Sequence, residues 1–224
     1  MIAKVRAWAR VHVDEDRYSP VGVAFHWTIA ALVFFQLWWG WRMGGRPAGY
    51  DKLEAYELHS QVGLLILVLT LLRMAWRLVI PGPFNDADKP GWQSAAAHLT
   101  HFVFYACLVG LPLSGWAIWS AMAAEQGLSV AGVLPWPHLP LHELPRPLRW
   151  AVLEWGRHAH FALVLTLLAL IPMHVGAALK HHFWDKDDVL AGMLPVSRSL
   201  VNRAREDLKH RPTPPRSPRP SNAG

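Results

Sequence analysis

Two histidines, His160 and His174, stand in an apolar run that carries no charged residue from position 158 to position 179. They are 14 residues apart, so in a helix with 100° per residue their side chains lie about 40° apart, on one face. At a rise of roughly 1.5 Å per residue, about 21 Å separates them along the axis. Ionisable side chains inside a membrane are costly and mark functional sites. The pair therefore predicts two stacked cofactors, each taking one imidazole from this helix.

The elements that must position these histidines are membrane-spanning helices. The 224 residues are 52% hydrophobic and 17% charged, and the hydrophobic residues fall in long runs. A transmembrane helix needs about 20 such residues, and four runs predict one each. These runs lie at 21–41, 58–72, 91–124 and 158–179, and the second begins a span that ends among Arg73 and Arg77. A short polar turn at 44–57 is expected between the first two spans. The sequence thus predicts an all-α membrane protein, a four-transmembrane-helix bundle.

Charge distribution predicts the orientation of this bundle. Of the 22 Lys and Arg residues, 16 lie on the same side of the predicted membrane as the N-terminus and 6 lie on the opposite side. The positive-inside rule then places both termini in the cytoplasm. We expect a basic cytoplasmic segment at 1–17, one membrane domain at 18–195 and a disordered Arg- and Pro-rich tail at 196–224. The basic tail suits anionic lipid and no nucleic acid, because no nucleic-acid motif accompanies it.

This topology predicts which histidines share a level. His59 stands where the second span begins, on the outer side, and is therefore level with His160. His26 lies about 9 Å into the first span from the cytoplasmic side and is level with His174.

An alternative partner for His174 comes from the third span. His98 and His101 are three residues apart, on nearly one face, at the cytoplasmic start of that span. They compete with His26, although polar residues at a membrane interface or lining a quinone pocket would show the same pattern.

Cysteine and histidine usage narrows the cofactor chemistry. Cys107 is the only cysteine, which excludes intrachain disulfides and iron–sulfur clusters, and its apolar neighbours predict a core position. The 13 histidines point instead to imidazole ligation, for which haem iron is one natural acceptor.

The segment 125–155 is rich in Pro and Trp, and we expect it to lie on the outer membrane surface as a loop. His138 and His142 are four residues apart, and His158 and His160 two apart, so a zinc site is an alternative use of these histidines.

With the histidines placed, the chain resembles the bacterial cytochrome b561 family over about residues 18–195. The resemblance is carried by FHW at 25–27, ELHSQVGLLILVLTLLRMAWRL at 57–78, AHLTHFVFYACLVGLPLSGW at 97–116 and HFALVLTLLALIPMHVGAALKHHFW at 160–184.

Membership would imply a multi-pass protein of the bacterial inner membrane whose four helices enclose two b haems. One haem would be held by His59 and His160 near the periplasm, the other by His26 and His174 near the cytoplasm. Two axial imidazoles leave the iron six-coordinate, which suits electron transfer.

The resemblance also implies substrates. Some members resemble superoxide oxidases, which pass electrons from superoxide outside to ubiquinone inside; others serve as cytochrome subunits that exchange electrons with a hydrogenase or another periplasmic redox protein. Both functions remain open at this point, beside a haem-free transporter or assembly factor whose histidines bind metal.

Further contacts are expected around these centres. His181 follows His174 by two helical turns and is the expected quinone residue. The expected quinone or haem-propionate contacts beside it are Arg73, His101 and Lys180, and the expected outer anion contacts are Lys52, Arg149 and Arg157.

Overall fold

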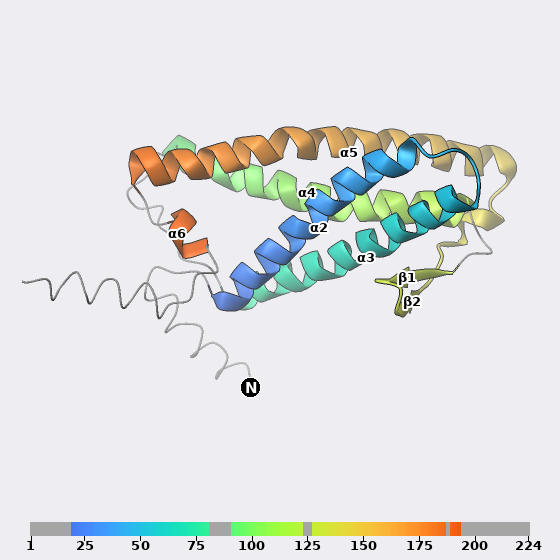
Figure 1. The fold of residues 1–224 in the computed structure, drawn as a ribbon, viewed down its shortest axis with the longest axis horizontal. Helices are drawn as coiled ribbons and strands as arrows, with labels where there is room; N and C mark the ends of the chain where they lie inside the picture. The colour runs from blue at the N-terminus through green and yellow to red at the C-terminus, as the bar shows by residue number, and fades with distance from the viewer. Residues whose placement is uncertain (1–18, 81–90, 123–126, 187–188, 194–224) are drawn as a thin grey trace, which may run out of the picture. The chain divides into compact units, whose positions relative to one another are not determined.

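The computed structural model describes residues 19–80, 91–122, 127–186 and 189–193, and it is mostly helical (Figure 1). The long helices are α2 (Pro20–Gly44), α3 (Tyr50–Val79), α4 (Gly91–Met122) and α5 (Arg146–Lys180). All four are long and apolar enough to cross a membrane. The predicted spans are confirmed, whereas the predicted segments 1–17 and 196–224 lie outside the described residues.

The start of α2 follows from its sequence. Ser19 is the N-cap, and its hydroxyl accepts a hydrogen bond from the Gly22 amide at 3.1 Å. Pro20 fills the first helical position, where its missing amide hydrogen has no cost. The Trp76 indole of α3 donates to the same hydroxyl at 2.9 Å, which ties the start of α2 to the end of α3.

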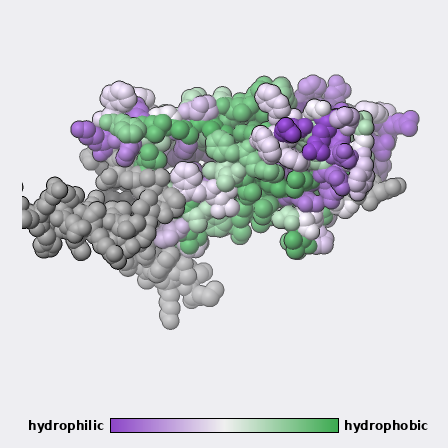
Figure 2. Space-filling model, viewed as in Figure 1, coloured by the Kyte–Doolittle hydropathy of each residue, from purple (hydrophilic) through white to green (hydrophobic). Residues whose placement is uncertain are grey.

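The helices pack in chain order, α2 on α3, α3 on α4 and α4 on α5. Among the described residues, α5 makes hardly any backbone contact with α2 or α3. A core between the two histidine levels joins all four helices through Ile29, Val33, Ile66, Cys107 and Leu167. Cys107 is buried there, as its apolar neighbours predicted. The surface over the middle of the bundle is apolar, with hydrophilic residues toward its ends (Figure 2).

Two expected loops are partly wrong. Residues 50–57, expected as part of a polar turn at 44–57, form the first two turns of α3. Residues 146–155, expected as part of a surface loop at 125–155, begin α5. Both segments contain charged residues and lie outside the uncharged runs that predicted the spans, but charged residues alone do not end a helix. Pro147 stands at the N-terminus of α5, where proline is tolerated.

The rest of the outer connection contains a β-hairpin that the sequence reading did not predict. Strands β1 (Leu128–Val130) and β2 (Leu134–Trp136) pair antiparallel, with Val130 opposite Leu134. Ala131 and Gly132 have φ values of 52° and 72°, so the turn uses left-handed backbone. A 3-10 turn, η1 (Pro140–Glu143), follows and leads to α5.

The inner end is completed by a π-helical turn, η2 (His181–Asp185), and the short helix α6 (Val189–Met193). The Trp27 indole of α2 donates to the Met193 carbonyl at 2.6 Å. This bond attaches α6 to the N-terminal part of α2, next to His26.

Candidate functional site

The outer histidines face each other from α3 and α5. The ring centroids of His59 and His160 are 6.2 Å apart, with the ring planes inclined by 60°. Both rings line a cavity with about 700 Å³ of empty space, including its open mouth. The other lining residues are mostly apolar and come from all four long helices and from Leu128 of the hairpin.

The inner histidines repeat this arrangement between α2 and α5. The ring centroids of His26 and His174 are 6.4 Å apart, and their planes are also inclined by 60°. Leu167 of the central core stands on α5 midway in sequence between His160 and His174. The structure therefore brings together both pairs that topology placed at common levels.

The spacing within each pair fits a metal ion held between two imidazoles. An imidazole–metal bond is about 2 Å long and each Nε2 lies roughly 1.1 Å from its ring centre, so two opposed ligands have centroids about 6 Å apart. The observed separations of 6.2 and 6.4 Å agree with this value. A flat macrocycle additionally needs space between the helices that supply the ligands.

That space distinguishes the two candidate partners of His174. His101 of α4 is also close, with a ring-centroid separation of 6.0 Å from His174. Phe104 of the same helix meets His174 edge to face, with centroids 5.2 Å apart. However, α4 and α5 pack directly on each other, whereas α2 and α5 hardly touch. The looser packing of α2 on α5 favours His26 over His101 as the partner of His174 across a flat macrocycle. His98 is exposed and contacts the Ser94 carbonyl at 2.9 Å.

Ser114 prepares His160 for ligation. Its hydroxyl donates to the Leu111 carbonyl at 2.9 Å and lies 2.9 Å from His160 Nδ1. Because the only hydroxyl hydrogen is already used, His160 Nδ1–H must be the donor in the second bond. This tautomer leaves the Nε2 lone pair available for a metal, a typical role for a residue behind a ligating histidine.

Two glycines keep the space around the outer pair clear. A Cβ on Gly40 of α2 would lie 3.5 Å from His59 Cε1, and a Cβ on Gly115 of α4 would lie 3.7 Å from His160 Cε1. Any longer side chain would enter the region of the rings. In the same region, Gln36 donates to the His59 carbonyl at 2.7 Å, and His59 Nδ1 is buried without a partner among the described residues.

The inner pair has a different hydrogen-bond partner. Arg73 Nη1 lies 3.0 Å from His26 Nδ1, and an arginine can only donate, so Nδ1 accepts here. The neutral ring then carries its proton on Nε2. Ligation through Nε2 requires Arg73 to release Nδ1, which frees the guanidinium for another anionic or polar partner.

The remaining predicted inner residues form a separate group at the end of α5. Asp185 Oδ2 accepts from Lys180 Nζ at 2.7 Å and lies 2.8 Å from His181 Nδ1. The structure thus joins Lys180 to His181, while Arg73 and His101 lie beside the inner histidine pair.

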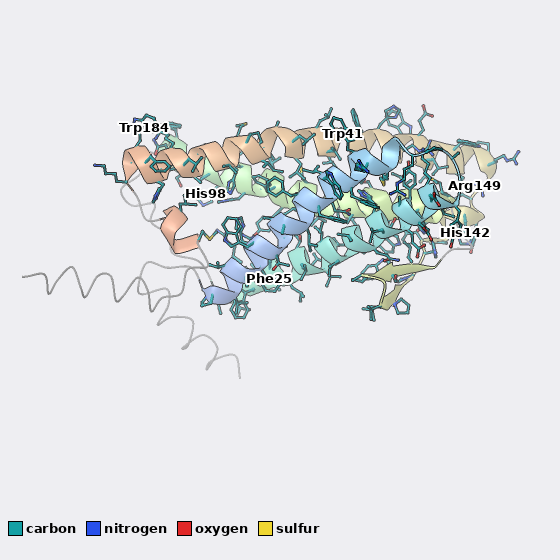
Figure 3. The ribbon with its side chains drawn as sticks, in the orientation of Figure 1. Phe25, Trp41, His98, His142, Arg149 and Trp184 are labelled. Atoms are coloured by element: carbon teal, nitrogen blue, oxygen red, sulfur yellow. The ribbon has the colours of Figure 1, made fainter. Side chains whose placement is uncertain are left out.

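The predicted outer cations do not gather on the histidines. Arg157 contacts the Met122 sulfur at 3.8 Å, and Arg149 lies at the outer end with His142, opposite Trp184 and His98 (Figure 3). Within the described part of the chain, neither these arginines nor Lys52 hydrogen-bonds His59 or His160. Carboxylates also occupy the outer segments, at Asp51, Glu54, Glu57, Glu143 and Glu154.

The zinc alternative was tested on the same residues. Over the described ranges, no three or more His, Cys, Asp or Glu side chains converge as potential metal ligands. His142 instead lies 3.8 Å from Glu143.

Three residues at the candidate site, Asp185, Ser114 and Gln36, were not predicted from the sequence. Asp185 had a readable signal, because it follows His181 by four residues and so shares its helix face. Ser114 and Gln36 are isolated polar residues in apolar runs, and nothing in their spacing relates them to His160 or His59.

Together, a four-span helical bundle with facing histidine pairs at two levels defines a membrane protein built to hold porphyrin-type cofactors between its helices. Residues 17–196 match the family model for prokaryotic cytochrome b561. The chain therefore belongs to the prokaryotic cytochrome b561 family. It is a multi-pass protein of the bacterial inner membrane, and its family carries electrons with b-type haem.

Several relatives match over nearly their whole length. The chain is 32% identical over 187 residues to cytochrome b561 homolog 2 of Escherichia coli K12, covering 82% of this chain and 94% of the relative. It is 27% identical over 183 residues to the probable superoxide oxidase CybB of Yersinia pestis, covering 81% and 98%. It is 29% identical over 189 residues to cytochrome b562 of Cereibacter sphaeroides, covering 81% and 97%.

Proposed function

We propose that the chain carries electrons across the inner membrane through two b haems, one between His59 and His160 and one between His26 and His174. The observation that carries this proposal is the pair of matching histidine spacings, 6.2 and 6.4 Å, at two levels of α5. With two imidazoles on each iron, a haem supplies one-electron transfer and has no open position for oxygen.

Residues of the protein orient the proposed haem ligands, leave space beside them and separate the two proposed haem sites. Ser114 keeps His160 in the tautomer that leaves Nε2 free, and Gly40 and Gly115 leave room beside the outer rings. The apolar core at Ile66 and Leu167 separates the levels and excludes water from the region between them. Arg73, once released from His26, is the cation positioned to meet a haem propionate or a quinone oxygen.

At the outer side, we assign superoxide as the electron donor and, at the inner side, ubiquinone as the acceptor. Two superoxide anions each give up one electron and leave as oxygen, and one quinone takes both electrons and two protons. The resemblance to a probable superoxide oxidase supports this assignment. Lys52, Arg149 and Arg157 would attract the anion locally, although carboxylates share the outer end.

Stopped-flow mixing of the oxidised, quinone-loaded protein with superoxide tests this assignment. We expect haem reduction much faster than the spontaneous loss of superoxide, with a rate that falls as salt screens the outer cations. Haem reduction no faster than spontaneous loss would reject superoxide. It would favour a cytochrome subunit that receives electrons from a periplasmic redox protein or hydrogenase-like complex.

For the inner side, we expect His181 to exchange protons with the quinone. Asp185 Oδ2 lies 2.8 Å from His181 Nδ1 and accepts a hydrogen bond from Lys180 Nζ, so a carboxylate stands beside the ring that would exchange protons. Replacing His181 with Ala should lower quinone reduction on the order of 100-fold under saturating electron supply, the usual loss for a proton-transfer group. Asp185→Asn, which removes only the orienting charge, should cost roughly tenfold.

His182→Ala is the matched control for this prediction, because His182 is the next residue and packs on Phe183. Quinone reduction should be unchanged in that variant. Equal rates in His181→Ala and the parent protein would show that the proton passes elsewhere.

A further inference from the structure

The turn of the β1–β2 hairpin presents two apolar side chains to the outside. Val133 is 85% exposed and Leu134 is 60% exposed. No charged residue occurs from position 126 to position 142, so the whole hairpin lies in an uncharged stretch. Figure 1 shows the hairpin beside α3, rather than beyond its outer end.

The hairpin is held firmly against the bundle. Leu128 and Val130 are buried against Leu64, Leu67 and Trp119 of α3 and α4. The Trp116 indole donates to the Pro137 carbonyl at 2.9 Å, and the Leu139 amide donates to the Ser120 hydroxyl at 3.1 Å. Because the inward face is packed and pinned, the exposed turn cannot fold back to hide its apolar residues.

One hydrogen bond fixes the depth of the turn. The Ala131 amide donates to the Gln61 carbonyl of α3 at 3.3 Å. Gln61 follows His59 by two residues, which is about 3 Å further into the membrane along α3. His59 faces His160, which itself lies just inside the uncharged run 158–179 of α5. The turn is therefore level with the outer edge of the apolar band, where headgroups give way to acyl chains.

From this depth, we propose that Val133 and Leu134 insert into the outer leaflet and that lipid is the partner of the hairpin turn. The uncharged composition of residues 126–142 suits the headgroup–acyl boundary. Leu128 of the same hairpin lines the outer histidine cavity. Lipid contact at the turn thus anchors one wall of that cavity to the membrane.

Spin labelling of the full-length, haem-loaded protein in lipid nanodiscs tests this proposal. Cys107 is the only native cysteine and is buried, so a Cys107→Ala background allows labels at Val133→Cys or, separately, Leu134→Cys. Collision with oxygen, which concentrates in lipid, is compared with collision with a water-soluble nickel chelate. Leu165→Cys on the exposed apolar side of α5 serves as the lipid control, and Glu143→Cys in η1 as the aqueous control.

We expect labels at positions 133 and 134 to favour oxygen over the nickel chelate, as at position 165 and unlike position 143. Nickel accessibility equal to that at position 143 would place the turn in water and overturn the proposal. Protection from both reagents would also overturn it, because the turn would then be covered by protein, such as a second copy of the chain.

Discussion

Replacing His160 with Ala is expected to leave a chain that holds one haem instead of two. The outer iron would lose one of its axial imidazoles. His174, about 21 Å further along α5, and its partner His26 would be unchanged. The haem content per chain should fall by about half, and the remaining spectrum should be that of a low-spin haem with two histidine ligands. Haem extraction with optical quantification, together with the spectrum of the reduced protein, measures both quantities.

The matched control for His160→Ala is His158→Ala. His158 lies two residues earlier on α5, is exposed and packs against Trp155, so it contributes no ring to the outer pair. That variant should keep both haems. If His160→Ala loses both haems while His158→Ala keeps them, the bundle does not assemble a stable inner site alone, and independent assembly of the two sites is contradicted.

Replacing His26 with Ala is expected to interrupt transfer across the membrane without blocking electron uptake. The outer haem should still be reduced by superoxide, because His59 and His160 are untouched. Quinone reduction driven by superoxide should fall to background, since the inner iron has lost its ligand from α2. The two halves of this result are measured separately, haem reduction by stopped flow and quinone reduction by ultraviolet absorbance.

His101→Ala is the comparison that decides the partner of His174. His101 lies 6.0 Å from His174, slightly closer than His26 at 6.4 Å, but it comes from α4, which packs directly on α5. We expect His101→Ala to keep the inner haem. Loss of the inner haem in His101→Ala with retention in His26→Ala would reverse the assignment.

Much of the architecture could be predicted from sequence because a membrane restricts the choices. A spanning segment must satisfy its backbone internally, so long apolar runs can only be helices, and alternate helices run in opposite directions. The same logic predicts that His59 lies level with His160 and His26 level with His174. Ligation itself remains a prediction, which the variants above test.

Features outside the apolar band could not be predicted in the same way. The first turns of α3 and α5 contain charged residues and lie outside the long uncharged runs, so hydrophobicity did not distinguish helix from loop there. The hairpin depends on contacts with distant partners, such as the Ala131–Gln61 bond, and its turn uses Ala131 in a left-handed conformation that its residue type does not favour.

Within the site, the contacts that could not be predicted from the sequence are those between side chains of different helices. The choice between His26 and His101 depends on which helices touch, and sequence spacing contains no such information. The hydrogen bonds of Ser114 to His160 and of Arg73 to His26 join residues 46 and 47 positions apart. Only the His181–Asp185 contact, between residues four positions apart on one helical face, was available to local reasoning.

The number of haems per chain tests the central claim most directly. The protein, purified in detergent under conditions that retain haem, should contain two b haems for each polypeptide, with haem measured by extraction and protein by amino-acid analysis. A value close to two agrees with a bis-histidine centre at each level of α5. A value close to one, in protein saturated with haem, would contradict the account, because one of the two histidine pairs would then serve another purpose.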